Sequence, residues 1–250
     1  MQAPLLSIVV PVYNEGDNIA WFLRELEASV AEPHETLIVY DFPEDNTLPA
    51  IAALDPPVAN VRLVHNTIGR GVLNAYRAGF AAAKGDVIVT MVSDRADDPR
   101  DVPAMARMVR AGADVAAASR YMRGGRRVGG PLLGRTLSRV AGLTLRWFAG
   151  VPTHDATNNF RAYNRRILRI PIESKASFAL GLELMLKAHW HGWRIEQLPT
   201  TWQDRTAGES QFKLWAWLPQ YLHWYVLGFK HAWMPGALAR WRASHLLPRD

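Results

Sequence analysis

The sequence predicts an α/β fold, in which a mostly parallel β-sheet carries helices on both faces. Two observations lead to this prediction. Short apolar runs bounded by Gly, Pro, Asn and Asp alternate with longer segments whose apolar residues recur at helical spacing, as in repeated strand–helix–strand units. The chain also has 250 residues, which is enough to cover both faces of such a sheet with a sizeable core.

The first half of the chain carries the clearest alternation. Strands are expected at Leu5–Pro11, Glu35–Asp41, Asn60–His65 and Asp86–Met91. Helices are expected between them at Asn18–Val30, Leu48–Ala53 and Gly71–Ala83, and a further helix begins near Pro99. Strands that are joined by helices in this way run parallel, so their carboxyl ends meet at one edge of the sheet.

The alternation fades in the second half. A strand is expected at Asp114–Ala118, and the stretch 123–130, rich in Gly and Arg, predicts a mobile basic loop. Helices at Leu132–Phe148 and Phe178–Trp190, a strand at Trp193–Leu198 and aromatic amphipathic helices complete the chain. No internal repeat or low-complexity linker is present, so we expect one main domain over 1–212 and an appendage over 213–250.

Charge is distributed unevenly along the chain. Residues 1–118 carry 9 Lys and Arg against 16 Asp and Glu, a formal charge of −7, whereas residues 119–250 carry 20 against 7, a formal charge of +13. A basic half suits nucleic acid, anionic lipid or a phosphorylated substrate. We do not expect nucleic acid, because the basic stretches match no recognisable binding module and the acidic half would repel a phosphate backbone.

The C-terminal segment is rich in tryptophan and basic residues. Five of the ten tryptophans lie there, at Trp215, Trp217, Trp224, Trp233 and Trp241. Because Trp and basic side chains favour the headgroup region of a bilayer, the segment predicts a membrane-interface helix pair; an aromatic core or a dimer contact is the alternative. The longest uncharged stretch, 214–229, is shorter than the roughly 20 residues that span a bilayer, and no signal peptide is expected. The absence of cysteine excludes thiolate metal sites.

Three carboxylates follow the apolar run that begins at Val87. Asp94, Asp97 and Asp98 lie within five residues, at the end of an expected strand. Carboxylates gathered at that edge repel one another unless a cation joins them, so they indicate a site for Mg²⁺ or Mn²⁺. On this segment alone, capping of the helix near Pro99 explains the carboxylates almost as well.

Six motifs occur in an order that resembles a known family. They are LSIVVPVYNEGDNI, LIVYDFPEDNT, NTIGRGVLNAYRAGFAAAKGD, ASRYMRGG, DATNNFRAYNRRIL and DRTAGESQF. In this order and at these intervals, over about residues 6–215, they resemble the inverting family-2 glycosyltransferases of the GT-A (Rossmann-like) fold. The similarity is strongest to the dolichol-phosphate mannosyltransferase-like, or polyprenol-phosphate glycosyltransferase, branch.

The resemblance implies a nucleotide-diphosphate sugar as donor, a polyprenyl or dolichyl phosphate as acceptor, and a divalent cation. By position it implies donor contacts at Pro11, Tyr13, Glu15, Asp41, Arg70 and Gly71. It implies acceptor-side contacts at Asp155, Asn159 and Arg161, and a mobile loop over the donor that contains Arg205 and Ser210.

The chain departs from the family pattern at the metal motif. Asp94 matches the second acidic position, but Val92 stands at the first one and Ala96 at the usual Gln. We expect Asp97 or Asp98 to replace the missing ligand, because Mg²⁺ or Mn²⁺ can be held by one or two carboxylates together with water and phosphate. The alternative is weakened metal dependence or poor donor binding.

The resemblance and the charge pattern together suggest a mechanism. A phosphate acceptor is already anionic and needs no strong base, so the difficulty is to bring it close to a diphosphate. Arg135, Arg139 and Arg146 fall within about 40° of one another on a helical wheel and predict a cationic stripe, for which a solvated face is the alternative. With the resemblance, we expect Arg120, Arg139 and Arg135 to hold the acceptor phosphate, Asp94 and Arg205 to act on the donor side, and the sugar to transfer in one displacement with inversion.

Other functions are also compatible with the sequence. A family-2 enzyme with a saccharide or soluble acceptor would need a carboxylate base, for which Asp155 or Glu183 qualifies. A nucleotide-sugar-binding protein with a lost metal site is the non-catalytic alternative. For an enzyme with a lipid acceptor, we expect a peripheral position at the cytoplasmic face of a membrane; the sequence does not distinguish a monomer from a homo-oligomer.

Overall fold

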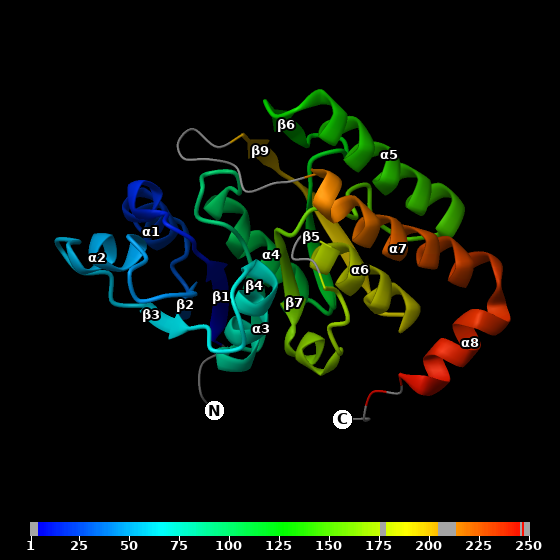
Figure 1. Cartoon of the computed structure of the whole chain (residues 1–250), viewed down its shortest axis with the longest axis horizontal. Helices are drawn as coiled ribbons and strands as arrows, with labels where there is room; N and C mark the ends of the chain where they lie inside the picture. The colour runs from blue at the N-terminus through cyan, green and yellow to red at the C-terminus, as the bar shows by residue number, and fades with distance from the viewer. Residues whose placement is uncertain (1–4, 176–178, 205–213, 246, 248–250) are drawn as a thin grey trace.

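A seven-stranded sheet runs through the centre of the protein (Figure 1). The structure, a computed structural model, describes residues 5–175, 179–204, 214–245 and 247, and of 214–217 only the backbone. The strands of the sheet are β1 (Leu6–Pro11), β2 (His34–Tyr40), β3 (Val61–His65), β4 (Val87–Thr90), β5 (Val115–Ser119), β7 (Arg161–Asn164) and β8 (Ile195–Pro199). Their order in space is β3-β2-β1-β4-β7-β5-β8, and every pairing in this sheet is parallel except those of β7 with β4 and β5. The prediction of a mostly parallel sheet is confirmed.

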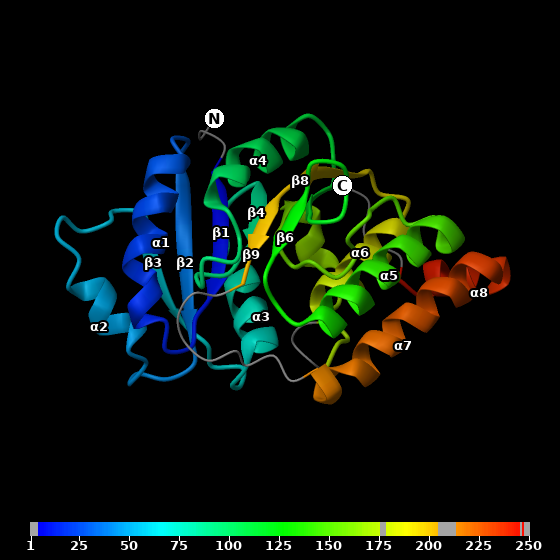
Figure 2. The same cartoon turned by 90° about the horizontal axis from the view of Figure 1, so that it is seen from above.

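Helices cover both faces of the sheet (Figure 2). The helices on one face are α1 (Gly16–Ser29), α2 (Thr47–Ala52) and α4 (Val102–Arg110), and those on the other are α3 (Val72–Ala82), α5 (Leu132–Ala149), α6 (Leu180–Trp190) and α7 (Leu214–Trp233). Each strand contributes alternate residues to the two cores: Ile8 and Val10 of β1 pack with α1, whereas Val9 between them packs with α3. The helix expected near Pro99 begins as a 3₁₀ turn, Pro99–Asp101, and continues as α4.

The antiparallel strand β7 is the main feature that the sequence does not indicate. It has four residues, and its first side chain, Arg161, is fully buried. Such a segment has neither the apolar run nor the alternation that identifies a strand. It becomes a strand because β4 and β5 pair with it on both sides, and those partners are distant in the sequence.

The expected mobile basic loop at 123–130 is wrong in part. Arg126–Val128 forms a short strand, β6, which pairs in parallel with β9 (Thr201–Gln203) in a separate two-stranded sheet. Two arginines in three residues give no strand signal, and the pairing partner comes from far along the chain. Gly129 and Gly130 then turn the chain with φ of 78° and 77°, a conformation that favours glycine.

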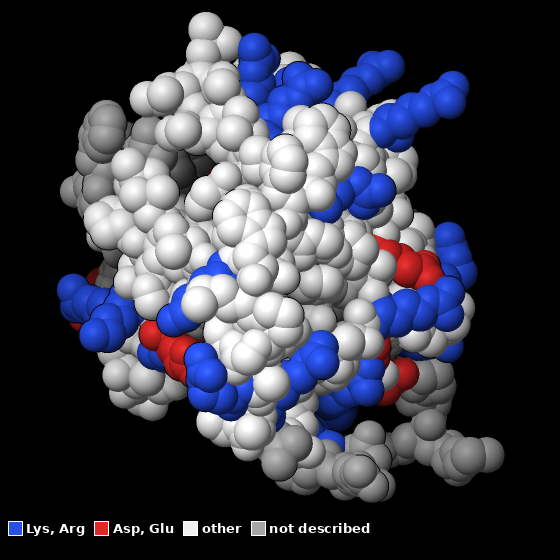
Figure 3. Space-filling view, turned by 90° about the vertical axis from the view of Figure 1, so that its right-hand side faces the viewer, with Lys and Arg blue, Asp and Glu red and all other residues white. Residues whose placement is uncertain are grey.

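The C-terminal segment contains the expected helices, α7 and α8 (Pro235–Ser244). Trp224 of α7 is buried in the core that α3 and α6 share, so the aromatic-core alternative holds for this residue, whereas Trp233 is 65% exposed. Figure 3 views the end of the molecule at which α7 and α8 lie and shows Lys and Arg around a broad uncharged area. No helix in the described part of the chain is long and apolar enough to cross a membrane. The proposed boundary at 212–213 falls outside the described residues.

Candidate active site

The carboxyl end of β1 leads into a loop that Asp45 holds in place. Asp45 is fully buried, and both of its carboxylate oxygens accept a hydrogen bond from the Asn14 amide at 3.1 Å. This contact stabilises the left-handed conformation of Asn14, whose φ is 53°. Pro11 ends β1, Tyr13 projects into solvent, and the Glu15 carboxylate accepts a hydrogen bond from a side chain of the first turn of α1 at 2.8 Å.

The ends of β2 and β3 add an aromatic and a cationic group to this edge. Asp41 bridges two loops, because its oxygens accept hydrogen bonds at 2.7 Å from the Asn66 side chain and from the Gly71 amide. The Arg70 guanidinium lies 5.4 Å from the centre of the Phe42 ring, and the Tyr13 ring meets Phe42 edge-on at 5.6 Å. The structure thus brings together four of the expected donor-side residues. It adds Phe42, for which the only sequence signal is its place directly after Asp41.

The acidic loop after β4 separates Asp98 from the other two expected metal ligands, Asp94 and Asp97. The Asp97 carboxylate is buried and reaches back to accept a hydrogen bond from the Val92 amide at 3.1 Å. Asp94 is half-buried and accepts one from the Ala96 amide at 3.1 Å. Asp98 instead caps the following 3₁₀ turn and pairs with Arg100 through both oxygens, at 2.7 and 2.8 Å. The helix-capping alternative therefore accounts for Asp98.

Asp94 and Asp97 form a pair of carboxylates that fits a hard cation. Burial raises the pKa of Asp97 to about 8, and the nearby Asp94 carboxylate adds to the rise. Such a pair is stable when it shares a proton or a cation, and oxygen ligands suit Mg²⁺ or Mn²⁺. In the described part of the chain no three His, Asp or Glu side chains gather as a metal cluster, so a cation here would also need water or substrate oxygens.

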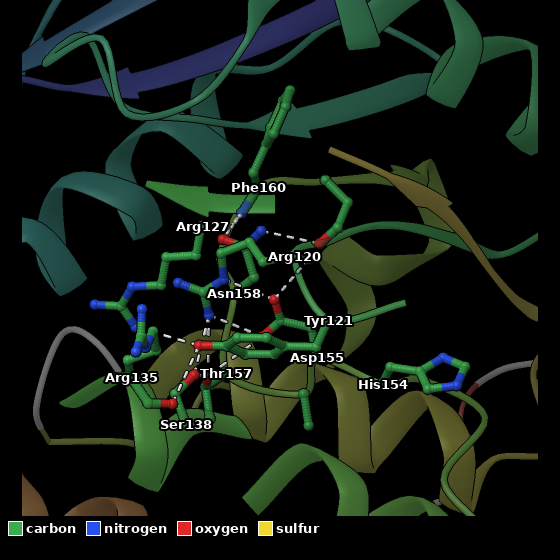
Figure 4. A network of polar contacts seen from close by, with 12 residues as sticks. Arg120, Tyr121, Arg127, Arg135, Ser138, His154, Asp155, Thr157, Asn158 and Phe160 are labelled. Atoms are coloured by element: carbon green, nitrogen blue, oxygen red, sulfur yellow. Dashed lines mark hydrogen bonds and ion pairs between the residues drawn. The ribbon is translucent and has the colours of Figure 1, made fainter. Parts of the chain in front are cut away.

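A second polar network lies beyond the end of β5 and centres on a buried ion pair (Figure 4). Asp155 is fully buried and accepts hydrogen bonds from Arg120 through its amide at 3.1 Å, its Nε at 2.7 Å and one terminal nitrogen at 2.8 Å. Burial acts to lower the pKa of Arg120, but Asp155 outweighs it and raises that pKa. The guanidinium therefore stays charged inside the protein.

Hydroxyl groups and further arginines surround this ion pair. Ser138 of α5 accepts a hydrogen bond from Arg120 at 3.1 Å and lies 2.6 Å from the Thr157 hydroxyl. Arg127 donates to the Tyr121 hydroxyl at 3.2 Å. The network therefore gathers more positive than negative charge. Ser138, Thr157 and Arg127 are absent from the sequence-based site, because each becomes recognisable only once α5, β6 and the loop before β7 meet.

The remaining expected arginines occupy different environments. Arg135 and Arg139 lie exposed on α5, and the Arg135 carbonyl accepts a hydrogen bond from Tyr121 at 3.4 Å. Arg161 is buried and donates to the carbonyls of Ala156 and Gly181. The Asn159 carbonyl accepts from the Thr90 hydroxyl at 2.5 Å, also inside the fold. The expected Arg205 and Ser210 lie outside the described residues.

Glu183, like Asp155, is a buried carboxylate that is paired with a cation. It is fully buried in α6, and its carboxylate accepts hydrogen bonds from the Glu173 amide at 2.6 Å and the Ser174 amide at 2.9 Å. The buried Lys187 ammonium completes the cluster 2.7 Å away. Lys187 also faces the ring of Trp224, at 5.2 Å from its centre. These contacts join α6 to α7.

Comparison with known proteins identifies a family and relatives that this chain resembles. The family model described as Glycosyl transferase family 2 matches residues 7–170. A polyprenol monophosphomannose synthase from Mycolicibacterium smegmatis is 30% identical over 214 residues, which are 82% of this chain and 79% of that protein. An undecaprenyl-phosphate mannosyltransferase from Micrococcus luteus is 32% identical over 213 residues, covering 81% of this chain and 85% of that protein.

Solved structures share the fold. Glucosyl-3-phosphoglycerate synthase from Mycobacterium tuberculosis, in complex with uridine diphosphate, superposes with a TM-score of 0.69. The match covers 91% of this chain and 80% of that one at 17% identity. At this identity the likeness concerns the fold alone.

Proposed function

Because the chain belongs to glycosyltransferase family 2, we propose that it transfers a sugar from a nucleotide-diphosphate sugar to the phosphate of a polyprenol, with inversion at the anomeric carbon. The two relatives, a polyprenol monophosphomannose synthase and an undecaprenyl-phosphate mannosyltransferase, support this acceptor class. The observation in the structure that carries the proposal is that two carboxylates, Asp155 and Glu183, are buried and already paired with cations.

A hydroxyl acceptor would require a carboxylate that is free to take its proton. Asp155 is closed off by Arg120, and Glu183 by Lys187 and two amides; both carboxylates are fully buried. Their oxygens already accept hydrogen bonds and lie inside the protein, so neither carboxylate offers an oxygen to the hydroxyl of a bound acceptor. A phosphate acceptor needs no such base and suits this arrangement.

The acceptor phosphate would bind at the network around Arg120. Arg120 is already oriented by Asp155, and Arg135 and Arg139 lie nearby in sequence on the exposed side of α5. Arg135 and Arg139 suit this role because the planar fork of an arginine pairs with two phosphate oxygens at once. Asp155 engages the Nε and one terminal nitrogen of Arg120, so Arg120 would contact the phosphate through its other terminal nitrogen. Ser138 and Thr157 would add hydroxyl donors to the same site.

The reaction itself is one displacement. An oxygen of the lipid phosphate forms a bond to the anomeric carbon while the bond from that carbon to the diphosphate breaks, and the electron pair leaves with the nucleoside diphosphate. No proton has to leave the attacking oxygen, so the chain contributes position and positive charge. Asp94 and Asp97 would hold the Mg²⁺ or Mn²⁺ whose charge offsets that of the leaving diphosphate. The contact between Asp97 and the Val92 amide supports Asp97 as the replacement ligand.

The donor would lie at the ends of β1, β2 and β3. Tyr13, Phe42 and Arg70 offer ring faces and a cation there, and Asp41 and Gly71 form the adjoining turn. These groups suit a nucleotide base and its phosphates. Both GDP-mannose and a UDP-hexose fit this proposal.

A membrane surface would supply the lipid acceptor, and α5 and α7 present an apolar face for it. The exposed apolar residues, here called the outer apolar surface, are Leu133, Leu137, Val140, Trp147 and Phe148 of α5 and Leu222, Val226 and Trp233 of α7. The two helices pack side by side, and Trp233 donates a hydrogen bond to the Phe148 carbonyl at 2.8 Å. Arg135, Arg139 and Lys230 lie on the same helices and suit anionic headgroups. We therefore extend the proposed interface from residues 213–250 to α5.

Sedimentation with anionic vesicles tests this surface. The double variant Val140→Glu with Val226→Glu should lose vesicle binding, because two charges would enter the apolar layer. Leu63→Glu is the matched control, because Leu63 is 47% exposed on β3, away from the outer apolar surface. Unchanged binding of the double variant would remove α5 and α7 from the interface.

The function is tested by direct transfer. Purified protein with Mn²⁺ is incubated with labelled GDP-mannose, UDP-glucose or UDP-N-acetylglucosamine and with either polyprenyl phosphate or soluble acceptors. We expect label in the lipid phosphate with one donor and no transfer to sugars. Transfer to a hydroxyl acceptor alone would favour the saccharide alternative, and nucleotide binding without transfer to any acceptor would favour a binding protein.

A further inference from the structure

The ring of Trp202 in β9 contacts two guanidinium groups at the proposed acceptor site, those of Arg127 and Arg120. The Arg127 guanidinium carbon is 4.7 Å from the centre of the Trp202 ring, and that of Arg120 is 6.0 Å away. Residues 127 and 202 are also direct partners in the parallel pairing of β6 and β9. The ring therefore has a fixed place relative to both strands.

Arg127 is held by aromatic groups rather than by an acid. Its contacts are the Trp202 ring face and the Tyr121 hydroxyl, and the described residues include no ion pair for it. Its Nε is buried and has no hydrogen-bond partner among them. Arg120, by contrast, is neutralised by Asp155. Arg127 is thus a partly buried cation with donors left over, next to a second guanidinium.

The backbone of β9 connects the proposed acceptor site with the acidic loop after β4. The Gln203 amide donates a hydrogen bond to the Ala96 carbonyl, in the acidic loop that carries Asp94 and Asp97, at 3.3 Å. This link to the donor side does not involve the Trp202 ring. Changes to the ring should therefore affect the acceptor side and spare the donor side.

We propose that Trp202 is a positioning residue, whose ring holds the Arg127 guanidinium as a ligand for the acceptor phosphate beside Arg120. This inference rests on the proposed function, because the phosphate it serves is that of the acceptor. An aromatic face suits the task because it orients a cation without neutralising it, whereas a carboxylate would compete with the phosphate. The sequence gives no sign of this role, since the pairing of β6 with β9 is not visible in it.

Steady-state kinetics with polyprenyl phosphate tests the proposal. Trp202→Leu should raise the KM for the lipid phosphate about tenfold, as expected for the loss of a cation–π contact in a partly buried site. The kcat and the Kd for the nucleoside diphosphate should change less than twofold. Trp202→Phe, which keeps a ring face, should restore the KM to within about threefold of the wild type. The matched control is Trp193→Leu, which removes a similar stack, with Arg166 at 4.3 Å; Trp193 precedes the first residue of β8, whereas Trp202 follows its last.

A double-mutant cycle shows whether Trp202 acts through Arg127. Arg127→Met alone should raise the KM at least as much as Trp202→Leu, and the two together should raise it no further. Fully additive effects, an unchanged KM in Trp202→Leu, or an equal loss of nucleotide affinity would each overturn the proposal.

A measurement without transfer separates this inference from the proposed function. Binding of inorganic phosphate, followed by ³¹P line broadening, should weaken in Trp202→Leu and in Arg127→Met but not in Trp193→Leu. If this pattern holds while the wild type transfers no sugar to polyprenyl phosphate, the function fails and the phosphate site stands. If transfer occurs but phosphate binding is the same in all variants, the function stands and the role of Trp202 fails.

Discussion

Asp155→Asn should destabilise the protein far more than its small change in size suggests. The Asp155 side chain is fully buried, and the side chain of its partner Arg120 is 9% exposed. The two Asp155 oxygens accept three hydrogen bonds from Arg120, so an amide at this position would turn one donor toward another. The guanidinium would also be left charged inside the fold without its counter-ion.

The expected loss follows from that uncompensated charge. Breaking a buried ion pair by removing one partner costs about 3–5 kcal/mol in the free energy of unfolding. For a chain of this size each kcal/mol shifts the midpoint of thermal unfolding by about 2–4 °C, so a drop of roughly 10 °C is expected. Replacing both partners, as Arg120→Met with Asp155→Leu, should recover part of the loss, because no lone charge then stays buried.

Urea unfolding and calorimetry of the purified variants measure these changes. The control is Glu27→Gln, which breaks a surface pair with Arg24 at 3.2 Å and should change stability by no more than about 0.5 kcal/mol. If Asp155→Asn unfolds within 1 kcal/mol of the wild type, the ion pair is open to water in solution and the reasoning about its closed carboxylate is refuted.

Three further predictions concern the metal, the packing of α5 and the response to pH. Excess Mn²⁺ should raise the thermal midpoint of the wild type by several degrees, as ligand binding to the folded state does. Asp94→Asn should abolish that shift in differential scanning fluorimetry, and a full shift in both Asp94→Asn and Asp97→Asn would exclude this pair as ligands. Gly142→Ala should cost about 1–3 kcal/mol in urea unfolding, because its methyl group would meet a backbone carbonyl of the loop before Asp155, whereas Gly134→Ala in open space on the same helix should be neutral or stabilising. Burial lowers the pKa of His231, so the unfolded chain takes up this proton first as the pH falls. The contribution of His231 to stability should therefore decrease from pH 7 to pH 5, and it is measured as the difference between the wild type and His231→Gln, because the raised pKa of Asp97 acts in the opposite direction over this range in both proteins.

Most of the fold was predictable from local patterns, and the exceptions share one cause. The strands and helices of the first half contain several buried apolar residues at regular spacing, so their positions follow from this periodicity. β7, β6 and β9 are three or four residues long and exist through pairing with segments far away in the chain. A short polar segment cannot reveal such a partner, because its hydrogen bonds are supplied by tertiary structure.

Part of the candidate site was predictable, namely the residues in the loops that follow the expected strands. Asp41, Arg70 and Gly71 were expected together on the donor side, and the structure places them together. Ser138 and Thr157 were not expected, because a hydroxyl on a helix or in a loop has no signal of its own. Their contacts with Arg120 and with each other become visible only when α5 lies against the loop before β7.

The division of charge along the chain matches the two sites of the proposed function, which would have different electrostatic requirements. The acidic half forms the edge at which burial and the nearby Asp94 carboxylate raise the pKa of Asp97. The basic half forms the network in which Arg120 is paired with Asp155 while Arg127 is held by Trp202. An anionic acceptor and an anionic diphosphate repel each other, so a transferase that joins them needs positive charge on both sides of the anomeric carbon. In the proposed reaction the chain itself supplies that charge on the acceptor side, whereas a cation bound together with the donor would supply it on the donor side. Removing the metal should therefore weaken binding of the nucleotide and leave binding of inorganic phosphate at the Arg127 site intact.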